Sequence, residues 1–199
     1  MATARRRDLR PKPIFDEPAL RSFVVGFGAK PVHMGHIWRH VTGQLRAGRE
    51  PTLHDVPQLP SGLGAALAAN FTVLTSEVIQ TDVSDIDGTM KLLIRLQDGS
   101  EIESVVIHHS GEAEHPEQRQ AERCGERLTL CVSSQVGCRL GCRFCATGTM
   151  GLQGNLWAGE IQEQLVHARV KAGGGTGAIG TIGNVVFMGM GEPMDNYDA

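Results

Sequence analysis

Apolar residues in the first third of the chain recur at the spacing of amphipathic helices. The first stripe is formed by Leu20, Phe23, Val24 and Phe27, which lie at i, i+3, i+4 and i+7. Asp16 precedes this stripe and is a natural N-cap. A second stripe predicts a helix over residues 34–45, and an Ala-rich run predicts a short helix that Ser61 caps and that ends near Asn70. We therefore expect a small helical domain over residues 14–70.

The pattern changes from helices to strands at Phe71. Three segments rich in β-branched and aliphatic side chains are expected to be strands: 71–80, 89–96 and 101–107. The Asp-Gly pairs at 87–88 and 98–99 are strong turn signals between them. We therefore expect a small antiparallel sheet over residues 71–108. The polar stretch 109–127 has no periodic apolar face and predicts a linker.

From Leu128 onward the pattern alternates between strand and helix. It predicts a short strand at 128–132, a helix at 158–171 and a continuous apolar strand at 185–188, as in buried parallel sheets. Such a β-α-β unit cannot bury both faces of its sheet alone. The expected fold class is therefore α/β with an α+β N-terminal region, and residues 128–199 are expected to be the truncated first part of a larger domain.

Composition and charge allow a packed core and suggest a polyanionic partner. Hydrophobic residues make up 41% and charged residues 21% of the 199 residues, and no stretch approaches the roughly 20 apolar residues that a membrane span requires. Residues 1–50 contain ten Lys or Arg and four Asp or Glu, whereas residues 51–199 contain nine and eighteen. The basic tail at 1–13 lacks the apolar region of a signal peptide. A cytoplasmic location is expected, with an organelle targeting remnant as the alternative.

Three of the five cysteines are spaced as a cluster-binding loop. Cys138, Cys142 and Cys145 form the pattern C-x3-C-x2-C. Three thiolates on one short loop can hold three irons of a cubane 4Fe-4S cluster and leave the fourth iron open. A structural zinc ion would need a fourth ligand, for which Cys131 and His167 are distant candidates. The spacing therefore favours the cluster over zinc.

The sequence around this loop resembles the RlmN/Cfr family of radical S-adenosylmethionine (SAM) enzymes. The resemblance is carried by TLCVSSQVGCRLGCRFCATG, NLWAGEIQEQLVHA and NVVFMGMGEPMDNYD, and before them by KPVHMGHIWRHV and EIESVVI. Members of this family methylate adenines of large-subunit ribosomal RNA and, in some cases, of transfer RNA. The resemblance implies a partial (β/α) barrel after residue 128 and contacts between the helical domain and RNA.

The resemblance also implies how a cofactor would be bound. The three cysteines of the loop would ligate the 4Fe-4S cluster, and its open iron would chelate the amino and carboxylate groups of SAM. One electron would then cleave the sulfonium and give a 5′-deoxyadenosyl radical. Gly191 and Glu192 match a motif that contacts SAM, and Asn196 is expected to add a polar contact. The alternative for residues 191–193 is a simple turn at the end of a strand.

Two further residues receive catalytic roles from the resemblance. Glu103 matches the glutamate that removes a proton from the methylated adenine carbon. On the expected strand Glu103 shares a face with Val105 and Ile107, so we expect apolar surroundings for the carboxylate. Cys131 matches a cysteine that pairs transiently with a methyl-carrying cysteine near the C-terminus of family members. The alternatives are a strand-edge charge for Glu103 and a small buried hydrophobe for Cys131.

Together these features predict a methyltransferase that forms 2-methyladenine in 23S-type ribosomal RNA and, as in some members, in transfer RNA. A flavodoxin- or ferredoxin-type electron donor and a monomeric chain without membrane contact are expected. Two alternatives stay open: methylation at the adenine C8 position, as in Cfr members, and a catalytically dead RNA-binding remnant with a structural cluster. Because full family members are longer, we expect the 199 residues alone to be inactive.

Overall fold

The structure is a computed structural model and describes residues 9–47, 49–109, 127–172 and 182–197. The predicted linker at 109–127 lies almost entirely outside these residues, as do most of the basic tail and Cys124. Within the described residues, no helix is long and apolar enough to cross a membrane.

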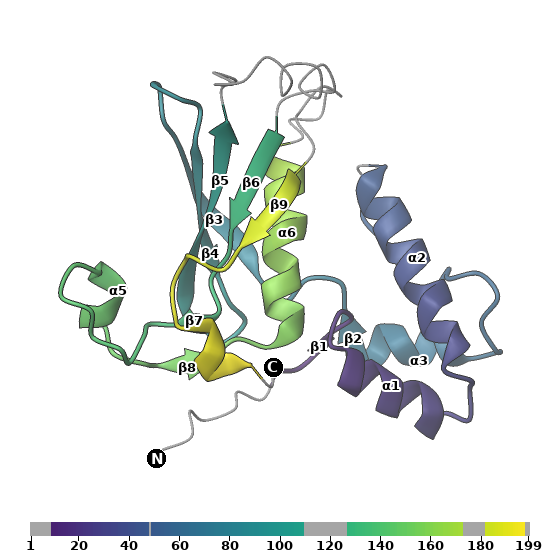
Figure 1. The fold of residues 1–199 in the computed structure, drawn as a ribbon. Helices are drawn as coiled ribbons and strands as arrows, with labels where there is room; N and C mark the ends of the chain where they lie inside the picture. Colours follow the sequence, from purple (N-terminus) through teal and green to yellow (C-terminus); the bar gives the residue numbers. More distant parts are fainter. Residues whose placement is uncertain (1–8, 48, 110–126, 173–181, 198–199) are drawn as a thin grey trace, which may run out of the picture.

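The N-terminal part of the described chain is helical (Figure 1) and contains α1 (Glu17–Gly26), α2 (Val32–Arg46) and α3 (Leu63–Asn70). The Asp16 carboxylate caps α1 by accepting the Ala19 N–H at 3.1 Å, as predicted. The cap predicted at Ser61 is wrong. Gly62 takes the N-cap position of α3 with a φ of 81°, in the left-handed region that favours glycine.

Buried apolar side chains from all three helices form one core. Its members include Ile14, Leu20, Val24, Ile37, Val41, Leu63 and Leu67. Of the stripe predicted for the first helix, Leu20 and Val24 are fully buried, whereas Phe27 is 42% exposed. The strand β1 (Lys12–Pro13) pairs in parallel with β2 (Phe71–Thr72). This pairing brings the two ends of the helical part together.

Five strands form one mixed sheet in the order β3-β4-β5-β6-β9. They are β3 (Glu77–Val83), β4 (Met90–Arg95), β5 (Glu101–His109), β6 (Arg127–Cys131) and β9 (Ile182–Val186). The pairs from β3 to β6 are antiparallel, whereas β6 and β9 are parallel. The sequence predicts a separate small sheet over residues 71–108. In the structure its strands belong to the larger sheet, because the second half of β5 pairs with β6.

Two predicted strands have different limits in the structure. The strand predicted at 71–80 is interrupted, because Thr75 and Ser76 turn toward α6 and bind Glu163. The strand predicted at 185–188 begins earlier, at Ile182, and pairs with β6 only as far as Val186. Its last predicted residue, Met188, is 80% exposed.

Short elements lie beyond the end of the sheet. The antiparallel pair β7 (Gln135–Val136) and β8 (Gly154–Asn155) encloses the cysteine loop and the single helical turn α5 (Ala146–Thr149). The 3-10 helix η2 (Pro193–Asn196) follows β9. In Figure 1 the pair β7 and β8 and the yellow turn of η2 lie below the arrowheads of β6 and β9, and α5 lies to their left.

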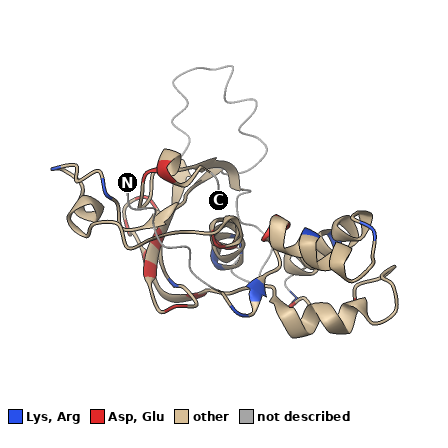
Figure 2. Cartoon of the chain, turned by 90° about the horizontal axis from the view of Figure 1, so that it is seen from below, with Lys and Arg blue, Asp and Glu red and all other residues tan. Residues whose placement is uncertain are grey.

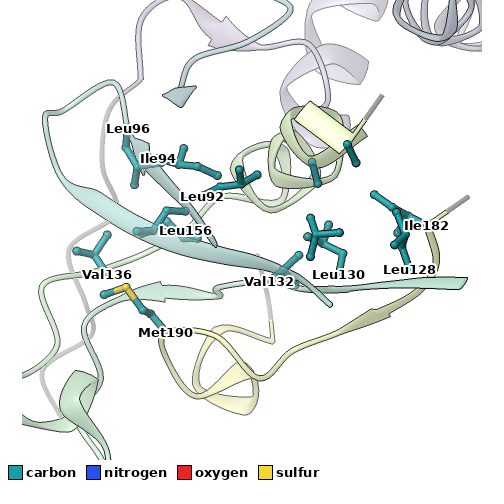
Figure 3. Close-up of a cluster of buried hydrophobic side chains, with 14 residues drawn as sticks. Leu92, Ile94, Leu96, Leu128, Leu130, Val132, Val136, Leu156, Ile182 and Met190 are labelled. Carbon is teal, nitrogen blue, oxygen red and sulfur yellow. The ribbon is translucent and has the colours of Figure 1, made fainter. Parts of the chain in front are cut away.

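The helix α6 (Ala158–Ala172) lies between the sheet and the helical part (Figure 1). Ala168 belongs to the core that α6 forms with the sheet, shown in close-up in Figure 3. Val166 packs instead against the core of the helical part. At the N-terminal end of α6, a Cβ on Gly159 would lie 2.7 Å from Cγ of Pro13. Glycine at this position therefore allows β1 to pass close to the helix.

The buried face of α6 is more polar than the sequence predicts, since the apolar spacing of the helix predicted at 158–171 places Ile161, Leu165 and Ala168 inward. Ile161 and Leu165 are only partly buried, although both contact the core. Glu163, Gln164 and His167 are almost fully buried. Buried polar groups require hydrogen-bond partners, and each of these three side chains has one.

The Glu163 carboxylate binds the segment that joins the helical part to the sheet. It accepts the N–H and the hydroxyl of Thr75 at 2.9 Å, and also the hydroxyl of Ser76. The Ser76 oxygen lies 2.9 Å from Nε2 of His167. Because the only hydroxyl proton of Ser76 goes to Glu163, the imidazole nitrogen must donate. Burial raises the pKa of Glu163 and lowers the pKa of His167 to about 4.

We predict that His167 makes the folded chain sensitive to acid. Its pKa falls from 6.5 to about 4 on folding, so the unfolded chain alone binds a proton between these values and stability decreases as the pH falls. At about 1.4 kcal/mol per pH unit, this loss is about 3 kcal/mol. Glu163 has the opposite effect on stability. Because its pKa is raised in the folded chain, its contribution to the free energy of unfolding decreases as the pH rises.

The measurement is urea unfolding between pH 7 and pH 4 for the wild-type chain and His167→Gln. The glutamine amide does not titrate and can still donate to Ser76, so the variant should lose much less unfolding free energy over this range. An equal loss in the two proteins would contradict the assignment.

Candidate active site

The cysteine loop and the 189–192 segment lie at the same edge of the sheet. Because β6 and β9 are parallel, their carboxyl ends meet there, which is where ligand sites of α/β folds lie. The two segments are joined through the Met190 carbonyl. It accepts the N–H of Ser134 at 2.8 Å and the N–H of Gln135 at 3.2 Å. The two parts of the predicted site are therefore adjacent.

The cysteine loop closes on itself. The Cys138 N–H donates to the Gly151 carbonyl at 3.1 Å, and the Cys145 N–H donates to the Cys142 carbonyl at 3.0 Å. Gly137 stands where the two ends of the loop cross, with a φ of 70°. A Cβ at Gly137 would collide with the Gly151 carbonyl oxygen, so this crossing requires glycine.

The three thiols of this loop are available as ligands. All three are free thiols; Cys138 is buried, and Cys142 and Cys145 are half-buried. The N–H of Gly148 and the hydroxyl of Thr147 lower the pKa of Cys145. A lowered pKa favours the thiolate, which is the form that binds a metal. This donor set fits an iron–sulfur cluster that is held by three cysteines.

A zinc ion would need a fourth ligand, and the structure places both sequence candidates elsewhere. His167 lies on α6 and binds Ser76, and Cys131 lies on β6 opposite Val105. In the parts of the chain that the structure describes, no three His, Cys, Asp or Glu side chains are grouped so that they could hold one metal ion. The same holds for Cys138, Cys142 and Cys145 as they stand, so the preference for a cluster over zinc rests on the spacing of these cysteines.

Gln135 fixes the 191–192 segment to the stem of the cysteine loop. Its side chain is fully buried. Its Oε1 accepts the Glu192 N–H at 2.9 Å, and its Nε2 donates to Oδ1 of Asn155 at 2.8 Å. Gly191 has a φ of 102°, and a Cβ there would lie 2.6 Å from Cβ of Gln135. Glycine is therefore needed for the segment to pass this closely.

Glu192 and Asn196 also support the local fold. Oε1 of Glu192 accepts the Met194 N–H at 3.0 Å and caps η2, so the simple turn considered as an alternative is present. Nδ2 of Asn196 donates to the carbonyls of Ser134 and Leu156, each at 2.8 Å. The structure places both predicted residues at the site, with the amide nitrogen of Asn196 bound to backbone.

An ion pair adds a second connection between the cysteine loop and η2. The Arg139 guanidinium contacts the Asp195 carboxylate. Arg139 directly follows Cys138, and Asp195 lies three residues after Glu192. The pair therefore joins a residue beside the first cysteine to the segment that follows the Gly-Glu motif.

Glu103 lies on the face of β5 that does not carry the core. Its neighbours Ile102 and Ser104 are buried on the opposite face. The side chain of Glu103 is 47% exposed, and Oε1 lies 3.4 Å from Nζ of Lys91. The alternation with Val105 is as expected, but the predicted apolar surroundings are wrong, because this face is open and carries a cation. The carboxylate is accessible to a substrate from this side.

Cys131 is almost fully buried on β6. Its register partner on β5 is Val105, so Cys131 and Glu103 belong to the same face of the sheet. Burial raises the pKa of the Cys131 thiol, although the Met188 N–H opposes this shift. A protonated, buried thiol is compatible with the small-hydrophobe alternative.

The sequence analysis did not predict a role at this edge for three buried polar residues: Ser133, Gln135 and Gln164. The available signal is the run of polar residues at 133–135, directly after an apolar strand and directly before the cysteine loop. Polar residues that stay buried must find partners. The partners come from α6 and from the chain after β9, which sequence spacing alone does not reveal.

No protein-family model matches the chain. It is 40% identical over 195 residues to the "Dual-specificity RNA methyltransferase RlmN" of Anaeromyxobacter sp. (strain Fw109-5), a match that covers 96% of this chain and 45% of that protein. It is 41% identical over 150 residues to the "Ribosomal RNA large subunit methyltransferase N" of Nitrosopumilus maritimus, covering 73% of this chain and 39% of that protein. The chain thus spans less than half the length of these curated relatives.

A solved structure has a similar fold. The crystal structure of a radical SAM methyltransferase from Sphaerobacter thermophilus matches with a TM-score of 0.68 and 34% identity, over 95% of this chain and 50% of that chain. The mixed α/β architecture predicted from the sequence is therefore confirmed. From the relatives, this structural match and the motifs around the cysteine loop, the chain belongs to the RlmN/Cfr-type family of radical SAM enzymes.

Proposed function

We propose that these residues are part of a radical SAM RNA methyltransferase that forms 2-methyladenine in 23S-type ribosomal RNA and, as in some family members, in transfer RNA. The observation that carries the proposal is the three-thiol loop, which Gln135 fixes beside Gly191 and Glu192. Relatives named as RNA methyltransferases support the choice of substrate class.

Cys138, Cys142 and Cys145 would hold a 4Fe-4S cluster. When bound, the cluster supplies the single electron that cleaves the sulfonium bond of SAM, and a flavodoxin- or ferredoxin-type protein would renew that electron. The Glu192 carboxylate would accept a hydrogen bond from the amino group of SAM. Its backbone N–H is bound to Gln135, so the position of Glu192 relative to the loop is set before a ligand arrives.

Glu103 would remove the proton from the methylated adenine carbon. The open face of β5 lets a base from RNA approach the carboxylate, and Lys91 restrains the carboxylate on that face. Cys131 belongs to the same face. We propose that it pairs transiently with a methyl-carrying cysteine, the role its counterpart has in the family.

The helical part would contact RNA phosphates. Its described cations are Arg10, Lys12, Arg21, Lys30, Arg39 and Arg49. Figure 2 shows Lys and Arg on the helices of this part, where Arg21 pairs with Glu17, and residues of both charges on the sheet. On α2, the half-buried His33, His36 and His40 lie beside the exposed Arg39 and form a polar face. Such a face suits contacts with an RNA backbone that do not depend on sequence.

The first prediction for this function concerns the cluster. After anaerobic reconstitution, the chain should contain about four iron and four sulfide atoms. Cys142→Ala should lose nearly all of both, because two thiolates cannot retain the cluster. Cys131→Ala should keep a wild-type content, because this thiol lies on the strand and not on the loop. Iron and sulfide analysis is the measurement, and stoichiometric zinc without sulfide would refute the proposal.

The second prediction concerns RNA binding. The logarithm of the association constant of the chain for a structured ribosomal RNA fragment should fall linearly with the logarithm of the salt concentration. Replacing Arg39 and Arg49 with Gln should make this slope less steep by about 2, which is about 1 for each phosphate contact that is lost. Arg95→Gln is the control, because Arg95 lies on the sheet and pairs with Glu77 and Glu101. A slope that the double variant leaves unchanged would argue against this surface.

The third prediction concerns the base, in a protein that spans the full length of the RlmN relatives and contains these residues. Glu103→Gln should stop formation of 2-methyladenosine and accumulate a protein–RNA crosslink, while cleavage of SAM continues. Glu101→Gln, on the same face of β5, is the matched control and should retain product. Nucleoside mass spectrometry and gel analysis are the measurements. Loss of SAM cleavage in Glu103→Gln would assign Glu103 to structure or cofactor binding instead.

A further inference from the structure

One buried hydroxyl connects the strand that carries Glu103 to the segment that carries Glu192. The Ser133 side chain is fully buried. Its Oγ donates to the Glu103 carbonyl at 2.6 Å and accepts the Met190 N–H at 2.8 Å. Met190 lies two residues before Glu192. The hydroxyl therefore forms a direct bridge between the two halves of the proposed site.

This bridge stands where the strand pairing ends. The ladder between β5 and β6 stops at the pair of Val105 and Cys131. Beyond that pair, the Glu103 carbonyl points toward a chain that has left the sheet. The Ser133 hydroxyl takes the place of the missing ladder partner, and its bond to Met190 continues the connection to the chain after β9. Hydrogen bonds in such a buried chain strengthen one another.

The position of the hydroxyl is itself tightly restricted. Gln164 binds the Ser133 backbone on both sides, accepting its N–H at 2.8 Å and donating to its carbonyl at 2.9 Å. On the opposite side, a Cβ on Gly189 would lie 2.8 Å from the Ser133 oxygen. The hydroxyl therefore has little freedom to move away from its two partners.

We propose that Ser133 is a positioning residue that fixes the base-bearing strand and the SAM-contacting segment relative to each other. It acts through the Glu103 backbone and through Met190, and does not itself touch substrate. The proposal rests on the proposed function, because it assumes that Glu192 contacts SAM and that Glu103 is the base. It adds a residue whose loss changes the response of the site to SAM without changing the cluster ligands.

The chain contains a matched control in the next residue. Ser134 is also buried, but its Oγ has no hydrogen-bond partner. Ser133→Ala and Ser134→Ala remove the same atom from adjacent buried positions. Only the first substitution breaks the bridge, so a difference between the two variants reports the bridge and not the general loss of a hydroxyl.

The first readout is amide hydrogen exchange in the 199-residue chain. In Ser133→Ala the Met190 amide should exchange about fivefold to tenfold faster, as expected for one lost hydrogen bond of ordinary strength. The Gly189 amide should change little, because it donates to the Val132 carbonyl at 3.1 Å. In Ser134→Ala both amides should exchange as in the wild type.

The second readout is the electron paramagnetic resonance signal during titration with SAM. It is recorded on the reduced, reconstituted protein that spans the full length of the RlmN relatives and contains these residues. The SAM concentration that half-converts the signal should rise about tenfold in Ser133→Ala and stay unchanged in Ser134→Ala. Iron and sulfide contents should be equal in all three proteins. If Ser133→Ala does not fold, Ser133→Cys gives the same comparison, because its thiol is a weak hydrogen-bonding group.

Equal SAM titrations of Ser133→Ala and the wild type would overturn the proposal, even if Met190 exchanges faster, because Ser133 would then serve stability alone. A wild-type protein of that length that binds a cluster but shows no response to SAM would overturn the proposed function and this inference with it. The two failures are distinguishable, because only in the second does the electron paramagnetic resonance signal of the wild type fail to respond to SAM.

Discussion

Ser133 and Ser134 follow β6 outside any strand while they remain buried, and their backbone groups lose the partners that a strand would provide. An unpaired buried N–H or carbonyl costs about 1–3 kcal/mol. Gln164 resolves this problem with one side chain, which binds the N–H and the carbonyl of Ser133 and the hydroxyl of Ser104. The stem of the cysteine loop depends on this amide, because it joins β5, α6 and the start of the loop.

The same constraint links the rest of the site. Once Ser133 is fixed, Met190 and Gln135 fix the chain after β9, and Asn196 returns to the Ser134 carbonyl. The result is a network in which the cysteine loop and the Gly-Glu segment cannot shift independently. Three thiolates that would hold a cluster and a carboxylate that would contact SAM need this kind of fixed separation, since misplaced reacting groups lose rate steeply. The helix that supplies Gln164 also supplies Glu163, so the helical part is anchored to the same element.

The sequence predicted most of the elements for identifiable physical reasons. The stripe around Leu20 and Val24, the Asp-Gly turns and the Asp16 cap are local signals, and the structure confirms them. The cysteine loop was recognisable because three cysteines at that spacing are typical of a loop that binds an iron–sulfur cluster. These features depend on residues close together in the chain.

Features that depend on distant residues were missed or misread. The polar face of α6 was unexpected, because its partners Thr75 and Ser104 lie about 60 to 90 residues earlier in the chain. Glu103 was assigned to an apolar face because alternation gives the residues on a face but not which face a helix covers. The separate small sheet was wrong for a similar reason, since only the pairing of β5 with β6 shows that the sheet continues.

The central claim is that three thiolates hold a cluster whose remaining iron is left for SAM. Mössbauer spectroscopy before and after addition of SAM tests this claim most directly, on a protein that spans the full length of the RlmN relatives, contains these residues and is reconstituted with iron-57. The account predicts a four-iron spectrum in which SAM changes the isomer shift of one iron and leaves the other three as they were. Four irons that SAM does not affect, or a chain that binds no iron with sulfide, would contradict it.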